Sequence, residues 1–469
     1  MTTLTPDICV IGAGSAGLTV AAAAANFGHK VVLIERDKMG GDCLNYGCVP
    51  SKSLIAAAKH AHLARSGGPF GVSACPAVDF SAVSDHVHGV IAAIAPHDSV
   101  ERFEGLGVHV IKAEARFVDG ETVEADGTKI KARRTVVATG SRPIMPPIDG
   151  LAEVAPLTNE SVFDITDLPL RLAVIGGGPI GAELSQAFVR LGSEVTVATG
   201  ETLLEREDPD AVAIVREKLT GEGVRLVERA MVERASRSPG GVVLSLDGGR
   251  TIEADKVLVA AGRAPSLENL GLEAAGIDHD RTGIKVDRGL RTTNRRVFAI
   301  GDVAGGLQFT HVAGHQASLA VRAIVFRLPV RYDPDLMPRV TYTSPELAQV
   351  GLSHAEALDR FGTAEAFTAP LSQNDRAKAD GTEDGFVKLV VSPKGKLVGA
   401  TIVAATAGDM IATYALALAA KVPLQAIASF TPAYPTLSES GKRAAVQYFA
   451  GRLGKPWVSR VLSLLKRLP

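Results

Sequence analysis

The sequence predicts an α/β protein in which two Rossmann-like dinucleotide-binding folds precede a smaller α+β domain. An apolar strand, a Gly-x-Gly-x-x-Gly turn, a helix and a second strand follow one another at residues 7–35 and again at residues 172–199. No third turn of this kind occurs after about residue 335, where strands such as residues 386–391 alternate with helices. One glycine turn is a weak signal, but two turns in this complete context are a strong one.

The composition fits an ordinary globular protein and excludes several classes. The 469 residues include 50 Lys and Arg against 51 Asp and Glu, and this net charge of −1 argues against a nucleic-acid binder. The length suggests about three domains. Four cysteines are too few for a disulfide scaffold, so a cysteine pair is interpreted first as redox or metal chemistry. No signal peptide or membrane-spanning stretch is evident, which predicts a cytoplasmic protein.

Each glycine turn places three glycines where a dinucleotide-binding turn requires them. The first allows the tight turn, the second lets the backbone approach a pyrophosphate, and the third lets the helix pack closely. These glycines are Gly12, Gly14 and Gly17 in the first fold and Gly176, Gly178 and Gly181 in the second. The phosphates are expected at the helix N-termini, which begin with Ser15 and Ala16 and with Pro179 and Ile180.

The same pattern predicts the boundaries of three domains. Residues 1–150 and 269–334 form the first dinucleotide-binding domain, residues 151–268 form the second, and residues 335–469 form an α+β dimerisation or interface domain. Glu35 ends the second strand of the first domain, where a carboxylate is placed to bind the hydroxyl groups of an adenosine ribose.

The segment Gly40–Lys52 contains a closely spaced cysteine pair. Cys43 and Cys48 lead directly into a helical pattern at residues 51–64, so Cys48 is expected near a helix N-terminus, where the dipole lowers the pKa of a thiol. Lys52 adds a cation nearby. The alternatives are zinc binding and inert structural thiols. A structural zinc site needs four ligands, and Cys9 and Cys75 supply no second pair, so no metal site is predicted.

These motifs together resemble those of the class I pyridine nucleotide–disulfide oxidoreductases, which include lipoamide dehydrogenase, glutathione reductase and mercuric reductase. The resemblance extends from Asp7 to about Ala450. The segments that carry it are Gly12–Gly17, Gly40–Lys52, Ala138–Ser141, Gly176–Glu183, Ala261–Arg263, Ile300–Val303 and Tyr434–Glu439.

The resemblance implies that FAD binds the first fold and NAD(P)H the second. It places Glu35 at the FAD ribose and Asp302 at the ribityl chain, with Thr139, Gly140 and Ser141 beside them. It implies that Lys52 pairs with Glu183 beside the flavin. The other residues expected at the two cofactors are Arg36, Gly41, Asp42, Ala115, Thr310, Thr199 and Gly262.

The resemblance also implies a redox-active disulfide between Cys43 and Cys48. Cys48 would be the thiolate that faces the flavin, and Cys43 the outer cysteine that exchanges with the acceptor. The implied assembly is a homodimer that acts on a small-molecule or small-protein redox acceptor.

The C-terminal motif departs from the family pattern. Enzymes that act on glutathione or lipoamide carry His-Pro followed by a glutamate, whereas this chain has Tyr434, then proline, then Glu439. A histidine has a pKa of about 6.5 and accepts a thiol proton, whereas a tyrosine with a pKa of about 10 is a poor base. An alternative interpretation is a core tyrosine that is hydrogen-bonded to Glu439. Asp42, where many relatives have threonine, is a second departure.

These observations predict a reductase that passes electrons from NAD(P)H to a disulfide, metal or quinone-like acceptor. Two alternatives stay open: a dihydrolipoamide dehydrogenase in which Tyr434 and Glu439 replace the usual pair, and a redox sensor of low turnover. Mercuric reductases normally end in a cysteine pair, and no cysteine follows Cys75. Thr199 and Gly200 stand where the nucleotide preference is usually set, and neither decides between NADH and NADPH.

The C-terminal tail suggests a helix with an apolar stripe and a basic face. The stripe consists of Trp457, Val458, Val461, Leu462, Leu465 and Leu468. The cations are Arg452, Lys455, Arg460, Lys466 and Arg467. Packing onto its own domain or onto a dimer partner is the favoured interpretation, and weak peripheral contact with an anionic membrane is the alternative.

Overall fold

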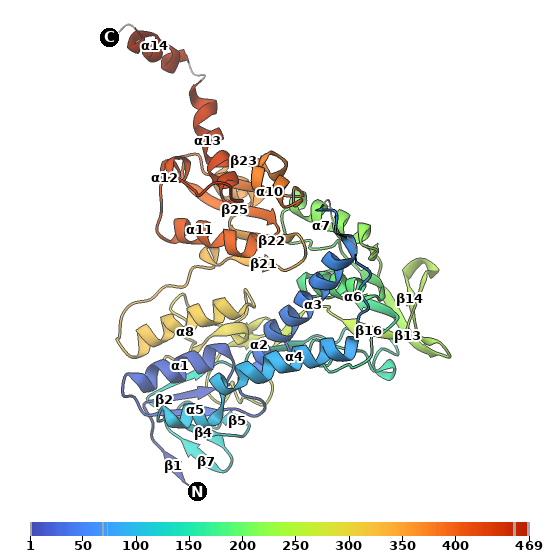
Figure 1. Ribbon diagram of the computed structural model, residues 1–469. Helices are drawn as coiled ribbons and strands as arrows, with labels where there is room; N and C mark the ends of the chain where they lie inside the picture. The colour runs from blue at the N-terminus through green and yellow to red at the C-terminus, as the bar shows by residue number, and fades with distance from the viewer. Residues whose placement is uncertain (1, 68–69, 73, 454–455, 467–469) are drawn as a thin grey trace. The chain divides into compact units, whose positions relative to one another are not determined.

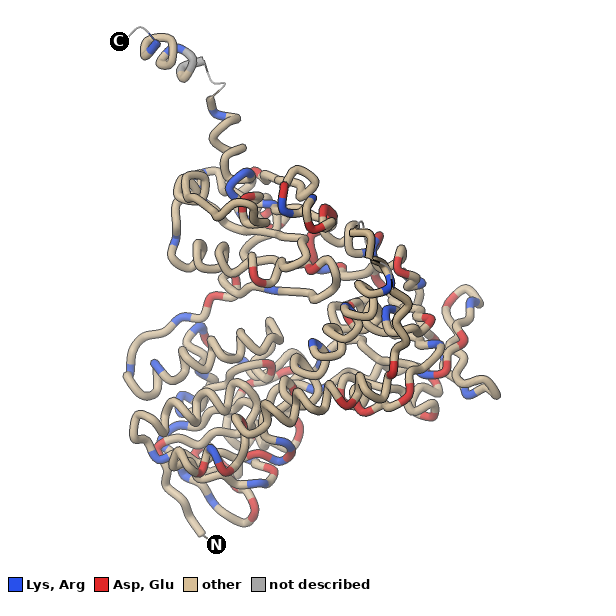
Figure 2. The backbone as a smooth tube through the Cα atoms, in the orientation of Figure 1, with Lys and Arg blue, Asp and Glu red and all other residues tan. Residues whose placement is uncertain are grey.

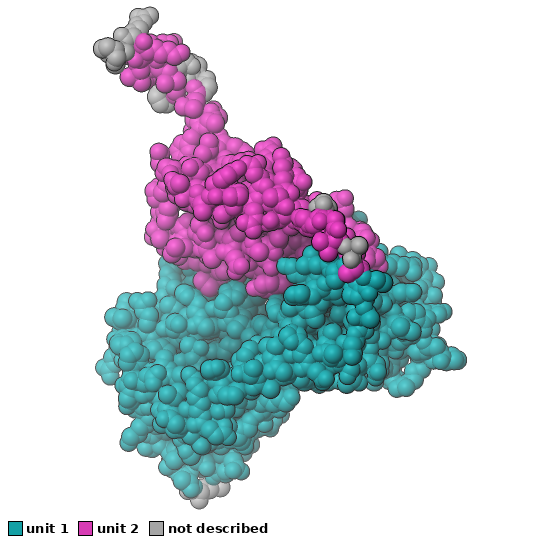
Figure 3. All heavy atoms as spheres, viewed as in Figure 1, with its two compact units in different colours: residues 1–64, 75–201, 225–334 teal, residues 65–74, 202–224, 335–469 magenta. Residues whose placement is uncertain are grey.

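The computed structural model describes residues 2–67, 70–72, 74–453 and 456–466. The chain divides into two compact units (Figure 3). Unit 1 contains Met1–Ala64, Cys75–Glu201 and Arg225–Pro334, and unit 2 contains Arg65–Ala74, Thr202–Val224 and Asp335–Pro469. Basic and acidic residues are interspersed along both units (Figure 2). Among the described residues, no helix combines the length and the apolar character needed to span a membrane.

The first sheet of unit 1 is parallel throughout. Its order is β20 (Val297–Ala299), β8 (Arg134–Val137), β2 (Ile8–Ile11), β3 (Val31–Ile34) and β4 (His109–Ile111). The strands β2 and β3 are continuous apolar runs that are fully buried, because both faces of the sheet are covered there. Helices α1 (Ser15–Asn26) and α8 (Thr310–Ile324) pack side by side against it (Figure 1). The small side chains of the alanine-rich α1 permit this close packing.

The second sheet of unit 1 repeats this design. Its parallel order is β12 (Arg225–Glu228), β11 (Glu194–Thr199), β10 (Arg171–Ile175) and β16 (Lys256–Val259). Helix α6 (Pro179–Leu191) follows β10, and most of its residues are buried. An antiparallel sheet of β13 (Val232–Ser238), β14 (Gly241–Leu246) and β15 (Thr251–Ala254) packs its apolar residues into the same core. Unit 1 therefore contains two parallel sheets, and a glycine turn follows β2 in the first sheet and β10 in the second. This arrangement confirms the α/β prediction.

Shorter elements complete unit 1. The helices are α2 (Gly41–Asn45), α3 (Cys48–Ser66), α4 (Phe80–Ile94) and α5 (Val100–Gly105). Helix α3 extends past Ala64 into unit 2 and begins three residues before the predicted start at residue 51. The strands are β1 (Thr3–Leu4), β5 (Ala115–Phe117), β6 (Val123–Ala125), β7 (Thr128–Ile130), β9 (Ser141–Pro143), β17 (Arg263–Pro265), β18 (His279–Asp280) and β19 (Gly283–Ile284).

Unit 2 is built on an antiparallel sheet. Its order is β21 (Arg339–Thr341), β22 (Glu346–Gly351), β25 (Leu397–Ala404), β24 (Phe386–Val391) and β23 (Glu365–Pro370). The helices of unit 2 are α7 (Pro209–Gly221), α9 (His354–Phe361), α10 (Asp375–Ala379), α11 (Ala407–Ala419), α12 (Leu424–Ser429), α13 (Glu439–Leu453) and α14 (Pro456–Leu465). Helices α11, α12 and α13 contribute to one core with the sheet.

A buried lysine joins α7 to this sheet. The Nζ atom of Lys388, on β24, lies 2.8 Å from both carboxylate oxygens of Asp208 and 2.6 Å from the carboxylate of Asp210. The side chains of Lys388 and Asp208 are 8% and 4% exposed, so neither charge is stabilised by bulk water. Asp208 also caps α7 by accepting hydrogen bonds from the backbone N–H groups of Asp210 and Ala211. This contact explains why residues 202–224 belong to the same compact unit as the C-terminal sheet.

We expect Asp208→Ala to lower the free energy of unfolding by about 3–5 kcal/mol, because it leaves the Lys388 ammonium buried without its main partner and removes a helix cap. Asp210→Asn is the matched control, since the side chain of Asp210 is 71% exposed, and its cost should stay below about 1 kcal/mol. Urea denaturation followed by circular dichroism measures both. Equal effects of the two substitutions would contradict this role of Asp208.

Candidate active site

The first glycine turn is shaped for a close backbone approach. Gly12 has a φ of +103°, and a Cβ atom there would lie 2.4 Å from the Ala138 carbonyl oxygen. A Cβ atom at Gly17 would lie 1.9 Å from the Gly12 carbonyl oxygen, so α1 packs directly against the turn. At Gly14, by contrast, the nearest atom to a Cβ would be 3.9 Å away. The first and third glycines are therefore required by packing, whereas the second faces room for a diphosphate.

The second turn has the same division of roles. Cβ atoms at Gly176 and Gly181 would lie 2.3 Å from the Ala260 carbonyl oxygen and 2.0 Å from that of Gly176, respectively. No atom lies within 4 Å of a Cβ position at Gly178. No side chain caps the first turn of α1 or of α6, so the N–H groups at these two helix N-termini are left to bind an anion beside Gly14 and Gly178. Both turns therefore fit the phosphates of a dinucleotide.

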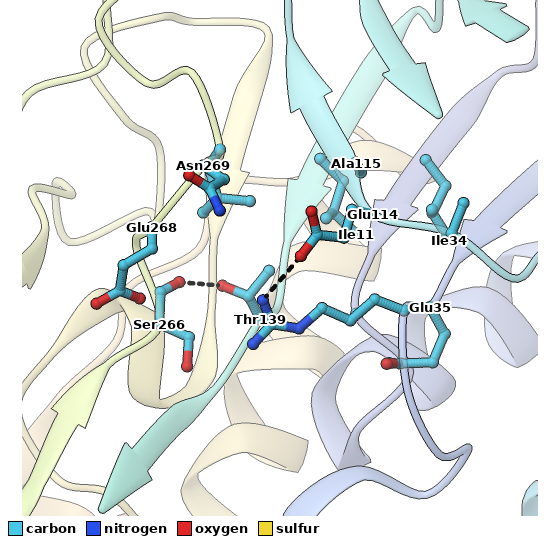
Figure 4. A pocket seen from close by; sticks show the side chains of 13 residues that line it. Ile11, Ile34, Glu35, Glu114, Ala115, Thr139, Ser266, Glu268 and Asn269 are labelled. Atoms are coloured by element: carbon cyan, nitrogen blue, oxygen red, sulfur yellow. Dashed lines mark hydrogen bonds and ion pairs between the residues drawn. The ribbon is translucent and has the colours of Figure 1, made fainter. Parts of the chain in front are cut away.

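A pocket adjoins the first turn and gathers five of the predicted residues (Figure 4). They are Gly12, Glu35, Arg36, Ala115 and Thr139. The two carboxylate oxygens of Glu35 accept hydrogen bonds from the N–H groups of Ala13, at 2.6 Å, and Asp37, at 2.7 Å. These bonds fix the carboxylate at the end of β3. Arg36 pairs with Glu114, which also lines the pocket.

Sequence reasoning missed one wall of this pocket. It is formed by Ser266, Glu268, Asn269 and Leu270, which follow β17. Thr139 anchors this wall by donating a hydrogen bond from its hydroxyl to the Ser266 carbonyl oxygen at 2.8 Å. The residues form a loop without a recognisable motif, so no pattern in the sequence marked them.

The segment Gly40–Lys52, which holds the cysteine pair and is called the redox segment below, lies against the first glycine turn. Gly41 has a φ of +58°, and a Cβ atom there would lie 2.7 Å from the Gly14 Cα atom. The N–H group of Gly40 donates a hydrogen bond to the Ala13 carbonyl oxygen at 3.0 Å. Cys43 on α2 and Cys48 at the start of α3 are therefore held beside the turn that fits the diphosphate.

The two active-site thiols differ in acidity. Neither sulfur is in a disulfide, and the Cys48 sulfur lies 3.1 Å from the Thr310 hydroxyl oxygen at the start of α8. A hydrogen bond from Cys43 lowers the pKa of Cys48 to about 6, with further contributions from Thr310 and the positive charge of Lys52. The same hydrogen bond and burial raise the pKa of Cys43. Near neutral pH the pair therefore holds its negative charge on Cys48.

Lys52 connects the redox segment to the second dinucleotide-binding fold. Its Nζ atom lies 2.7 Å from a carboxylate oxygen of Glu183 on α6. The Glu183 side chain is 7% exposed and the Lys52 side chain is 37% exposed, so the carboxylate is buried while the lysine keeps contact with water. The structure therefore brings together the two residues whose pairing the sequence suggested.

A third group of predicted residues surrounds Asp302. The Ser141 hydroxyl donates a hydrogen bond to Asp302 at 2.5 Å, and burial raises the pKa of Asp302. Gly140 and Gly262 adopt positive φ angles of +71° and +117° on either side of the β9–β17 pair. In the second fold, Thr199 is the last residue of β11 and packs its side chain against Gly177.

Tyr434 and Glu439 lie in unit 2 and do not form the expected pair. Tyr434 is 71% exposed, and its hydroxyl donates a hydrogen bond to Asp375 at 3.3 Å. Glu439 accepts a hydrogen bond from the Thr436 N–H group at 3.3 Å. The alternative interpretation of a core tyrosine bonded to Glu439 is therefore wrong, because the loop before α13 turns the phenol outward.

Within the part of the chain that the structure describes, no three side chains of the His, Cys, Asp or Glu type are grouped to hold a metal ion.

Two family models match the chain. One is described as pyridine nucleotide-disulphide oxidoreductase and matches residues 6–317. The other is the dimerisation domain of the same family and matches residues 337–445.

Curated relatives with two activities are similar to the chain. Mercuric reductase of Bacillus cereus is 36% identical over 451 residues, which cover 94% of this chain and 71% of that protein. Dihydrolipoyl dehydrogenase of Geobacillus stearothermophilus is also 36% identical over 451 residues, which cover 94% of this chain and 95% of that protein.

Solved structures agree in fold. The HOCl-induced flavoprotein disulfide reductase RclA from Escherichia coli has a TM-score of 0.84 at 27% identity and covers 94% of this chain and 99% of its own. LpdA from Mycobacterium tuberculosis has a TM-score of 0.87 at 29% identity and covers 96% of this chain and 100% of its own.

The chain therefore belongs to the pyridine nucleotide–disulphide oxidoreductases. Within this family it is an NAD(P)H-dependent flavoprotein enzyme that uses FAD, and it carries the family's dimerisation domain. The family, the fold class and the two cofactors predicted from the sequence are confirmed.

We expect the alkylation rate of Cys48 by iodoacetamide in the reduced protein to rise with pH around a midpoint near 6, because the thiolate is the reactive form and is populated above its pKa. Cys43→Ala should move this midpoint upward the most, and Thr310→Val and Lys52→Met should move it upward by less. Peptide mass spectrometry measures the rate at each pH. A midpoint near 8.5, the value of an ordinary cysteine, would refute the assigned acidity.

Proposed function

We propose that this enzyme is a reductase that passes electrons from NAD(P)H through FAD and the Cys43–Cys48 pair to a disulfide, metal or quinone-like acceptor. FAD, when bound, supplies the two-electron chemistry between the nicotinamide and the disulfide. The observation that carries the proposal is the placement of the Cys43–Cys48 pair beside the first glycine turn, with Thr310 against the Cys48 sulfur. In keeping with this geometry, the pKa of Cys48 is lowered and that of Cys43 is raised.

For a disulfide acceptor, the residues of this chain support a balanced exchange. Reduction of the Cys43–Cys48 disulfide by two electrons yields the Cys48 thiolate and, after uptake of one proton, the Cys43 thiol. Cys43 attacks one acceptor sulfur and forms a mixed disulfide with it, and the proton of Cys43 passes to the other acceptor sulfur, which leaves as a thiol. The Cys48 thiolate then attacks the Cys43 sulfur and displaces the remaining acceptor sulfur as a thiolate, which restores the Cys43–Cys48 disulfide. Lys52 and Thr310 stabilise the thiolate between these steps.

The assignment of regions is part of the proposal. Residues 1–150 and 269–334 are assigned to FAD, residues 151–268 to NAD(P)H and residues 335–469 to homodimer formation. The glycine turns, the pocket beside the first turn and the match to the dimerisation-domain model support this assignment. The acceptor is proposed only as a class, because the relatives differ in what their names say they act on.

Tyr434 favours reduction of an acceptor over oxidation of a dithiol. A dihydrolipoyl dehydrogenase must remove protons from its dithiol substrate, and a tyrosine side chain is a poor base at neutral pH. Reduction of a disulfide acceptor requires only the proton of Cys43 to be moved, and the acceptor sulfur that this attack releases takes up that proton. Dihydrolipoyl dehydrogenase activity is the alternative, and it is supported by the 36% identity to an enzyme with that name.

We expect FAD-loaded protein to reduce NAD⁺ or NADP⁺ with dihydrolipoamide at a negligible rate, while NADH or NADPH reduces the bound flavin rapidly. Tyr434→His supplies the missing base and should raise dihydrolipoamide oxidation, and Tyr434→Phe is the matched control. Absorbance at the nicotinamide band measures the turnover. Robust turnover by the unmodified enzyme would replace the proposal with the alternative, and slow flavin reduction with no turnover would indicate a redox sensor.

Cys43→Ser separates acceptor classes. The variant should lose all turnover with a disulfide acceptor, because Cys43 is the residue that exchanges with that acceptor. It should keep most of its turnover with a quinone that takes electrons directly from the flavin.

We also propose weak contact between the C-terminal tail and an anionic membrane surface. On α14, Val461, Leu462, Leu464 and Leu465 are 46–65% exposed beside the exposed Arg460. This exposure disagrees with packing onto its own unit, although packing onto a dimer partner stays open. Lys455, Arg467, Leu468 and the side chain of Trp457 lie outside the described residues.

We expect full-length protein to co-sediment with phosphatidylglycerol vesicles more than with phosphatidylcholine vesicles, because binding combines apolar burial with attraction to anionic lipid. Deletion of the residues after Gly451 should abolish the difference. Binding that is unchanged by the deletion, or no binding at all, would exclude the membrane contact.

A further inference from the structure

Asp42 is anchored on two sides although it immediately precedes the redox-active Cys43. Its Oδ1 atom lies 3.0 Å from a guanidinium nitrogen of Arg263. The same oxygen accepts a hydrogen bond from the Asn159 amide at 3.0 Å. Asn159 is 7% exposed and also donates to the Tyr46 carbonyl oxygen at 3.3 Å, so it clamps the beginning and the end of α2.

Arg263 extends this anchor into the region of Asp302. Its Nε atom donates to the Ser141 hydroxyl at 2.8 Å, and an Nη atom donates to the Ser141 carbonyl oxygen at 2.9 Å. Ser141 in turn donates to Asp302 at 2.5 Å. An ion pair from Asp42 to Arg263, followed by hydrogen bonds through Ser141, therefore connects the residue before Cys43 to the carboxylate expected at the ribityl chain of FAD.

The charges of Asp42, Arg263 and Asp302 affect one another. Asp42 pairs directly with the guanidinium of Arg263, whose side chain is 11% exposed, and Asp302 is connected to it through Ser141. Burial and the negative charge of Asp42 raise the pKa of Asp302, while the positive charge of Arg263 lowers it. The planar guanidinium donates to Ser141 while it pairs with Asp42, a geometry that the single ammonium of lysine cannot reproduce.

We propose that Asp42 and Arg263 are positioning residues that couple the redox helix α2 to the flavin-side segment formed by Ser141 and Asp302. The proposal rests on the proposed function only in taking Cys43 and Cys48 as the redox pair. The position of α2 therefore depends on the ion pair between Asp42 and Arg263 and on the Asn159 hydrogen bond to the same carboxylate oxygen.

The coupling also affects the environment of Cys48. The groups that face Cys48 are Cys43 and Asp42 on α2, Lys52 on α3 and Thr310 on α8, and Glu183 on α6 reaches it through Lys52. Of these, Asp42 acts against the thiolate, because its negative charge raises the pKa of Cys48. Removal of that charge should make Cys48 reactive at lower pH while loosening the flavin-side contacts.

A double-mutant cycle of Asp42→Asn and Arg263→Lys tests the coupling. The first readout is the FAD dissociation constant, measured from the fluorescence of released FAD. The second is the pH midpoint of Cys48 alkylation in the reduced holoenzyme. Glu253→Gln is the matched control, because it also removes a carboxylate that pairs with an arginine, Arg171, at 3.4 Å. Both readouts are independent of any acceptor, so they stand even where the proposed function fails.

Each single substitution should weaken FAD binding by about five- to tenfold, an effect equal to the loss of about one ordinary hydrogen bond. The double variant should weaken it by no more than the worse single variant, since contacting residues are non-additive. Asp42→Asn should also lower the alkylation midpoint by roughly 0.5 to 1 pH unit. Glu253→Gln should change neither readout.

Additive effects on FAD binding, or an unshifted midpoint in Asp42→Asn, would overturn the coupling. Asp42→Thr serves where Asp42→Asn fails to fold, and it is expected to give the same two shifts because it also removes the charge. A threonine variant with unchanged FAD binding and an unchanged midpoint would likewise overturn it.

Discussion

The close backbone contact between the redox segment and the first glycine turn is the constraint on which the active site depends. Gly41 and Gly14 approach so closely that a side chain at Gly41 would collide with the turn. This contact places the two cysteines beside the helix N-terminus that fits the diphosphate. Helix α3 then carries Lys52 toward Glu183 of the second fold. A single glycine-to-glycine contact therefore orders the thiols relative to both dinucleotide-binding turns.

Charge placement around the thiols follows from this arrangement. Cys48 accepts a hydrogen bond from Cys43 and lies near the hydroxyl group of Thr310 and the ammonium of Lys52, and all three lower its pKa. Cys43 is half-buried. The pair is therefore polarised before any acceptor arrives. Asp42 opposes this polarisation, and Arg263 limits its effect by pairing with it. The reactivity of the site reflects the balance of these charges more than any one residue.

The C-terminal region illustrates the limits of local pattern. The sequence motif identifies Tyr434 as a candidate site residue. Its exposure and its hydrogen bond to Asp375, however, depend on the path of the loop before α13. Similarly, Lys388 reads as one charged residue in an otherwise apolar strand, a pattern that gives no indication of its partner. Its partner Asp208 is 180 residues away and reaches it because α7 packs on the sheet. Burial converts these two charges into a structural ion pair.

The sequence by itself determined the fold class, the two glycine turns, the cysteine pair and its helix, because each depends on backbone preferences within a dozen or so neighbouring residues. The expected meeting of Lys52 with Glu183 came from resemblance, and the structure placed them together. The tertiary structure alone decided the partners of Asp42, the pocket wall at residues 266–270 and the outward direction of Tyr434. Asn159 lies 117 residues from Asp42 along the chain. Such contacts arise from packing between segments that are distant along the chain, and a local sequence pattern does not predict them.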